Sequence, residues 1–161
     1  MTSQFAMTTH KFGIKLFFAN QRDRELTGFI PVFHGWIQRQ ALPGHLLIDV
    51  HDYSHVHHGP GILLVANEAN LSIDEAEGRR GLVYIRKQPA SLPEIVAAAR
   101  QAAKLLTEEQ GVQFEAGGFE VFINDRLQTP RASHIADAVG GNVTPKQTDP
   151  RERLAFVVQT G

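Results

Sequence analysis

The segment from Ser91 to Gln110 constrains the fold of this chain most strongly. Its apolar residues recur every three or four positions, which is the spacing of a helix with one buried face. Ser91 and Glu94 have the spacing of a capping box, and Gly111 suits the left-handed residue that ends a helix. The predicted buried stripe comprises Ile95, Val96, Ala99, Ala102, Ala103 and Leu106. A helix with one apolar face needs a second layer of structure to cover that face.

Short apolar runs bounded by polar, glycine or proline residues supply this second layer, because they have the length of strands. Strands are predicted over residues 12–19, 45–53, 62–67, 71–74, 82–86, 119–127, 142–146 and 154–159. Further helices are predicted over 30–40 and 130–139, the first with an apolar face of Phe29, Phe33, Trp36, Ile37 and Gln40. The predicted class is α+β, a mostly antiparallel sheet with two or three helices packed on one face.

The order of these elements repeats along the chain. A strand, a helix and two strands occur in residues 10–88, which also hold an inserted strand pair, and the same order occurs in 118–160. We therefore predict a single α+β domain over 10–161 that contains a duplicated β-α-β-β unit, its halves joined by the 91–110 helix. Residues 1–9 are predicted to be a flexible N-terminal tail.

Composition excludes several functions. The 16 Lys and Arg are scattered among 17 Asp and Glu, and the formal net charge is −1, whereas nucleic-acid binding needs a basic stripe. No window approaches the ~18 apolar residues of a membrane helix, and the first residues lack the pattern of a signal peptide. The absence of cysteine excludes disulfides, thiolate nucleophiles and cysteine-based metal sites. We expect a cytoplasmic protein without nucleic-acid or membrane partners.

Half of the eight histidines lie in one short segment, at His51, His55, His57 and His58. If the strand that starts at His45 continues through this segment, alternation divides its side chains into two sets. The set predicted to face the core is Leu46, Ile48 and Val50. The set predicted to share the other face is Asp49, His51, Tyr53, His55 and His57.

Two imidazoles on one strand face can reach a single metal ion, since alternate side chains start roughly 6–7 Å apart. The predicted metal ligands are His51, His55, His57 and, from the next strand, Glu68. Asp49 or Asp52 is a further candidate, either as a ligand or as the carboxylate that orients an imidazole. Nitrogen and oxygen ligands suit a divalent transition metal.

A structural interpretation of the histidines stays open. A run of histidines before Gly59-Pro60-Gly61 is also typical of a solvated loop end, and the spacing matches no known metal motif. The glycine-proline-glycine sequence itself predicts a tight connection between strands.

Arginines form the one basic concentration in the sequence, around residues 79–86. Guanidinium groups suit recognition of carboxylate or phosphate. The predicted ligand-binding residues are Tyr53, Arg79, Arg80, Tyr84 and Arg86. The alternative is a hairpin tip whose charges are solvated.

Three functional hypotheses follow from these observations. The first is a cytosolic domain that binds a small molecule or a metal in a pocket between sheet and helices, with the histidines at its rim. The second is a small enzyme acting on an anionic substrate, with His51 or His55 as general base or metal ligand and Asp49 as orienting partner. The third is an assembly protein that forms a homodimer through a strand edge.

Overall fold

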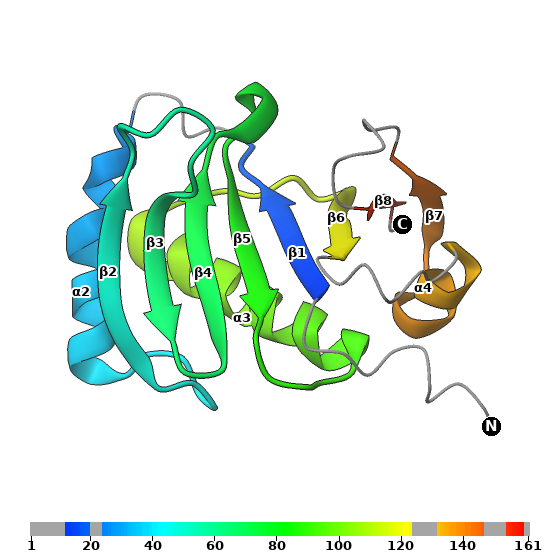
Figure 1. Ribbon diagram of the computed structural model, residues 1–161, viewed down its shortest axis with the longest axis horizontal. Coiled ribbons are helices and arrows are strands. Elements are labelled where there is room, and N and C mark those ends of the chain that lie inside the picture. Colours follow the sequence, from blue (N-terminus) through cyan, green and yellow to red (C-terminus); the bar gives the residue numbers. More distant parts are fainter. Residues whose placement is uncertain (1–11, 20–23, 124–131, 147–153, 160–161) are drawn as a thin grey trace.

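The computed structural model describes residues 12–19, 24–123, 132–146 and 154–159 (Figure 1). Within them, eight strands form one sheet in which every neighbouring pair is antiparallel. The strands are β1 (Phe12–Phe17), β2 (Leu47–Tyr53), β3 (Gly61–Ala66), β4 (Ala69–Asp74), β5 (Gly81–Arg86), β6 (Gly118–Ile123), β7 (Asn142–Pro145) and β8 (Leu154–Gln159). The helices are α2 (Phe29–Arg39), α3 (Leu92–Gln110) and α4 (Ala132–Val139), with short 3-10 turns η1 (Leu26–Gly28) and η2 (Ala76–Gly78).

The predicted α+β class is confirmed. Figure 1 shows α2 and α3 behind the sheet, and α4 packs against α3 and β7. The predicted tail 1–9 and residues 124–127 of the strand predicted over 119–127 lie outside the described residues.

The strand order β2-β3-β4-β5-β1-β6-β8-β7 places β1 and β6 side by side in the middle of the sheet. From β1, a connection containing α2 leads to β2 at one edge, and β3, β4 and β5 return toward β1. From β6, a connection containing α4 leads to β7 at the other edge, and β8 returns to β6. The first half has two strands more than the second, and the duplicated unit stays a prediction.

Helix α3 has the predicted boundaries. The Ser91 hydroxyl accepts a hydrogen bond from the Glu94 N–H, and the Glu94 carboxylate accepts one from the Ser91 N–H at 3.0 Å. Gly111 ends the helix with a φ of +70°. The predicted stripe is buried apart from Val96, which is partly buried. These local signals fix the helix because each satisfies backbone groups that the helix leaves without partners.

The core lies between the helices and the sheet. Phe29, Phe33 and Trp36 of α2 are fully buried, as their helical spacing predicts. The Trp36 indole N–H donates to Glu109 Oε1 on α3 at 3.1 Å, so the two helices are joined by a hydrogen bond as well as by apolar contact. Gln40 adopts a left-handed conformation at the end of α2, and its amide exchanges two hydrogen bonds with the backbone of Leu47 at the start of β2.

The prediction that Leu46 and Ile48 face the core is wrong. They are 56% and 52% exposed, whereas Leu47 is 3% exposed. The pairing of β2 with β3 shifts between Leu47 and Asp49, as in a β-bulge, so the side-chain alternation slips by one residue at Ile48. Beyond the bulge the predicted phase holds, and Val50 packs against the core.

Candidate functional site

Strand β2 ends at Tyr53, and the chain then turns through residues 54–60, which we call the histidine turn. The Asp52 carboxylate fixes the start of this turn by accepting hydrogen bonds from the hydroxyl of Ser54 at 2.6 Å and from its N–H at 2.9 Å. Because both bonds stabilise the ionised carboxylate, and the hydroxyl bond most strongly, they lower the pKa of Asp52.

This early turn separates the predicted set of side chains. The prediction that His55 and His57 share a strand face with Asp49, His51 and Tyr53 is wrong, because the strand has ended before them. The other three stay together. His51 Nε2 lies 3.6 Å from Asp49 Oδ2, and the rings of His51 and Tyr53 have centroids 6.1 Å apart.

The histidine turn forms one wall of a pocket with a volume of about 490 Å³. The facing wall is the connection between β4 and β5, residues 75–78, which we call the acidic corner. The titratable lining residues are Tyr53, His55, His57, His58, Glu75 and Glu77. The volume lies in the range of small-molecule sites, roughly 300–1,000 Å³. The two connections that line this pocket lie at the upper end of the sheet in Figure 1, so the pocket is at the end of the sheet and not between sheet and helices.

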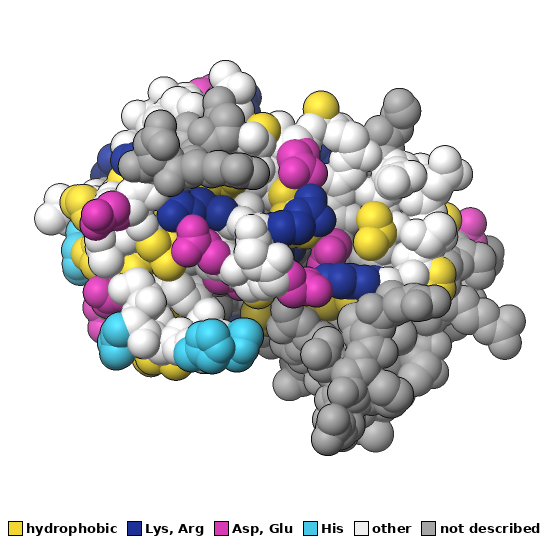
Figure 2. Space-filling model, turned by 90° about the horizontal axis from the view of Figure 1, so that it is seen from above, with side chains coloured by type: hydrophobic (Ala, Val, Ile, Leu, Met, Phe, Trp, Pro, Cys, Tyr) yellow, Lys and Arg dark blue, Asp and Glu magenta, His cyan; other side chains and the backbone are white. Residues whose placement is uncertain are grey.

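The three histidines of the turn are His55, His57 and His58. All three are exposed, and Figure 2 shows histidine side chains gathered at the surface of this end. In the part of the chain that the structure describes, no hydrogen bond holds the rings of His55, His57 or His58. The rings of His57 and His58 contact each other, with centroids 3.9 Å apart. Their nitrogens are therefore available to donate to or accept from a ligand.

The two carboxylates of the acidic corner are each held by a cation. Arg80 donates to Glu75 Oε2 from Nε at 2.9 Å, and its Nη2 lies 2.7 Å from the same oxygen. Lys146 donates to Glu77 Oε1, and this hydrogen bond lowers the pKa of Glu77. The backbone of Glu77 has a φ of +59°, which is uncommon for a residue other than glycine.

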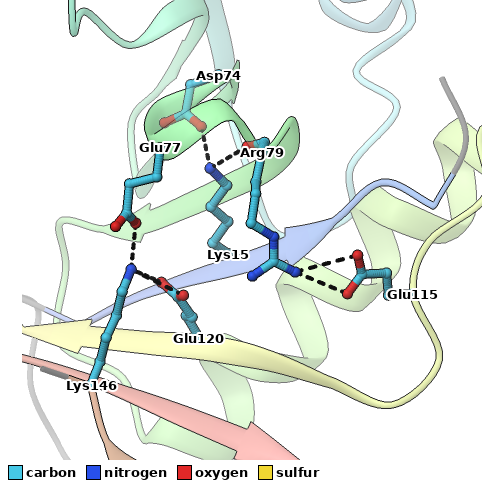
Figure 3. A network of polar contacts seen from close by, with 7 residues as sticks. All are labelled: Lys15, Asp74, Glu77, Arg79, Glu115, Glu120 and Lys146. Atoms are coloured by element: carbon cyan, nitrogen blue, oxygen red, sulfur yellow. Dashed lines mark hydrogen bonds and ion pairs between the residues drawn. The ribbon is translucent and has the colours of Figure 1, made fainter. Parts of the chain in front are cut away.

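Two sets of polar contacts lie beside the acidic corner (Figure 3): one joins β1 to β4 through Lys15, and the other joins Glu77 to β6 through Lys146, which follows β7. Lys146 also donates to Glu120 Oε1 of β6 at 3.2 Å. Partial burial lowers the pKa of Lys146, but the hydrogen bonds to Glu77 and Glu120 outweigh this effect, and the net result is a raised pKa. Lys15 of β1 is buried and donates to Asp74 Oδ1 at 2.7 Å.

The structure separates the two adjacent arginines that the sequence placed together. Arg80 supports Glu75 at the acidic corner. Arg79 lies with its guanidinium carbon 3.6 Å from the centroid of the Phe17 ring, and it donates to Glu115 at 3.1 Å. Arg79 is not among the residues that line the pocket.

Tyr84 and Arg86 lie together at the other end of the sheet, away from the histidine turn. Arg86 Nη1 donates to the Tyr84 hydroxyl oxygen at 3.0 Å, and that hydroxyl lies 2.6 Å from His45 Nε2. Burial raises the pKa of Tyr84, although Arg86 opposes the effect. The side chain of Tyr84 belongs to the buried core, and β3 and β4 separate β5 from β2. His45 was not predicted here; a buried tyrosine needs a partner for its hydroxyl, but no sequence signal identified which one.

Glu68, the predicted ligand from the next strand, follows β3, whereas the histidine turn precedes β3. Its carboxylate accepts a hydrogen bond from the Leu46 N–H at 2.8 Å. Desolvation raises the pKa of Glu68, but the hydrogen bond from Leu46 and other hydrogen bonds have the larger effect, so the net pKa is lowered. Glu68 is thus placed at the opposite end of β3 from His55 and His57.

Metal coordination requires several ligands around one point. Among the described residues, no group of three or more His, Asp or Glu side chains is arranged to hold a metal ion. The three histidines of the turn line one pocket, but they form no such group.

Sequence reasoning missed three members of the site. They are Glu75, Glu77 and His58, none of which was among the predicted site residues. The signal that could have indicated them is the run of four consecutive strands, because alternate turns of an antiparallel meander lie at the same end of the sheet.

Comparison with known proteins gives no further guidance: no family model, curated protein or solved structure matches this chain. Among the helices of the described residues, none has the length and apolar character to cross a membrane.

Proposed function

We propose that the protein is a ligand-binding domain whose site is the pocket between the histidine turn and the acidic corner. One observation carries the proposal. Three histidine rings that make no hydrogen bonds within the described residues line a pocket of small-molecule size. Because these rings are exposed and make no hydrogen bond to another described residue, a ligand can bind them without breaking a hydrogen bond of the fold.

The charges around the pocket indicate which ligands suit it. Arg80 offsets the charge of Glu75, and Lys146 offsets that of Glu77. The remaining polar side chains of the lining are the hydroxyls of Tyr53 and Ser54 and the imidazoles, which when neutral both donate and accept hydrogen bonds. Leu26 and Val56 add apolar surface to the lining. The favoured ligand is a small organic molecule with a hydrogen-bonding polar end and a short apolar part.

Binding is favoured over catalysis for a geometric reason. A catalytic imidazole needs a group that orients it, and a carboxylate is the usual choice. The nearest candidate in sequence, Asp52, accepts two hydrogen bonds from Ser54. The carboxylate that lies near an imidazole, Asp49, is beside His51, which does not line the pocket. A divalent metal would require the histidine turn to rearrange, because the described side chains do not converge on one point.

A fragment screen by nuclear magnetic resonance tests the proposal. An isotope-labelled sample of the full chain would be titrated with small carboxylic acids, phosphates, amines and neutral heterocycles, and with Zn²⁺ and Ni²⁺ separately. The histidine ring signals are the readout. Ligands of the pocket should shift the signals of His55, His57 and His58, and leave that of His34 unchanged, because His34 lies on α2 and does not line the pocket.

Two variants separate binding at the pocket from weak binding elsewhere. The double variant His55→Ala/His57→Ala should lose the binding of these fragments, and the matched control His34→Ala should retain it. Fragments that bind the double variant as tightly as the original chain would contradict the proposal. If only Zn²⁺ or Ni²⁺ shifts the histidine ring signals, the ligand of the pocket is a metal ion and the proposal of an organic ligand is wrong.

A further inference from the structure

The outer edge of β2 is paired with no other described strand, although the Gln40 amide binds the backbone of Leu47 at its start. β2 pairs with β3 on one side, and no described strand pairs with it on the other (Figure 1). The opposite edge strand, β7, has only four residues and includes Pro145, which cannot donate a hydrogen bond to a further strand. β2 is therefore the edge of this sheet that is suited to pairing.

Exposed apolar side chains gather at the same place. The large hydrophobic residues that are exposed in the described part of the chain are Leu46, Ile48, Tyr53 and Val56. All of them lie on β2 or within three residues of its ends. Contact with a second strand at this edge would remove part of their surface from water, which favours association.

The charges on β2 are self-complementary. Asp49 and His51 share one face of the strand, on either side of Val50. A two-fold axis perpendicular to the sheet at Val50 would pair two copies of β2 antiparallel and set Asp49 of each copy opposite His51 of the other. An axis at Asp49 would instead oppose two carboxylates, and an axis at His51 would oppose two imidazoles, so complementarity selects Val50.

The backbone agrees with this register. The Val50 N–H donates to Asp49 Oδ1 at 2.8 Å. In an edge strand alternate N–H groups point outward, and the N–H of Val50 has a side-chain acceptor in place of a neighbouring strand. In the paired state Val50 of the second copy would accept this hydrogen bond, and the Asp49 carboxylate would be released to bind His51 of that copy.

From these observations we infer that the protein forms a homodimer in which β2 pairs antiparallel with β2 of a second copy, centred on Val50. The inference does not rest on a ligand in the pocket, although Tyr53 and Val56 line the pocket as well as flank this edge. Sedimentation velocity of the untagged full chain at rising concentration should show a dimer. A monomer at every concentration would overturn the inference.

The absence of cysteine allows a direct test of the register. Asp49→Cys and His51→Cys chains, mixed and gently oxidised, should form a disulfide-linked heterodimer, and neither chain should link to itself. Self-linking of Asp49→Cys or of His51→Cys would overturn the Val50 register. The control is His34→Cys on the exposed face of α2, which should report only random collision.

A charge exchange tests the complementarity without relying on a single damaging substitution. Asp49→Lys should weaken dimerisation about tenfold, because two symmetry-related pairs are lost. The exchange Asp49→His/His51→Asp should restore it. An exchange variant that folds normally but dimerises no better than Asp49→Lys would overturn the contact assigned between Asp49 and His51.

Discussion

Lys15 is the most buried cation in the polar network of Figure 3, and its removal tests how that network stabilises the fold. The side chains of Lys15 and Asp74 are 8% and 14% exposed, and Lys15 also donates to the Arg79 carbonyl at 2.8 Å. Lys15→Met keeps most of the side-chain volume but leaves the carboxylate and the carbonyl without their donor.

Breaking a buried ion pair costs about 3–5 kcal/mol of unfolding free energy, and the partial exposure of Asp74 favours the lower end. We therefore expect Lys15→Met to lower the free energy of unfolding by about 3 kcal/mol. For a chain of this size that lowers Tm by about 6–12 °C, at about 2–4 °C per kcal/mol.

The double variant Lys15→Met/Asp74→Leu should be more stable than Lys15→Met alone, because it removes the charge that is left unpaired. Urea unfolding monitored by circular dichroism measures the free energy of unfolding of both variants. The control is Arg39→Met, which breaks a pair with Glu109 whose side chains are 51% and 32% exposed, and should cost less than about 1 kcal/mol. Equal losses in Lys15→Met and Arg39→Met would refute the reasoning.

Two other substitutions test particular contacts. Gly13→Ala should destabilise the protein by about 1–3 kcal/mol, because the new Cβ would lie 2.1 Å from Phe122 Cε2, and Phe122→Leu in the same chain should reduce that loss in urea unfolding. Lys146→Met should lower the free energy of unfolding most between about pH 4.5 and pH 10.5, the ordinary pKa values of Glu and Lys. The lowered pKa of Glu77 means that its ionised form stabilises the fold above pH 4.5, and the raised pKa of Lys146 means that its protonated form stabilises the fold below pH 10.5. The difference from the original chain should shrink as pH falls through the lowered pKa or rises through the raised one, and a difference that does not vary with pH would contradict this pairing.

The secondary structure followed from the sequence because its signals are local. The capping box of Ser91 and Glu94 and the left-handed Gly111 act within one helix, and apolar runs between turns act within one strand. Strand phase was less predictable. The bulge at Ile48 arises from pairing with β3, so alternation along β2 alone gave the wrong direction for Leu46 and Ile48.

The candidate site was predictable only in part. A dense run of histidines indicated where to look, and three of them line the pocket. The acidic corner that faces them is distant in sequence, and only the order of strands brings Glu75 and Glu77 to the same end of the sheet. The same strand order places Tyr84, Arg86 and Glu68 at the other end of the sheet, where the hydroxyl of Tyr84 is hydrogen-bonded to His45.

Crystals of the full chain soaked with the fragment set would test the central proposal most directly. We expect electron density for bound fragments between the histidine turn and the acidic corner, within hydrogen-bond distance of His55, His57 or His58. Fragments that bind elsewhere, with none in this pocket, would contradict the proposal that it is the ligand-binding site.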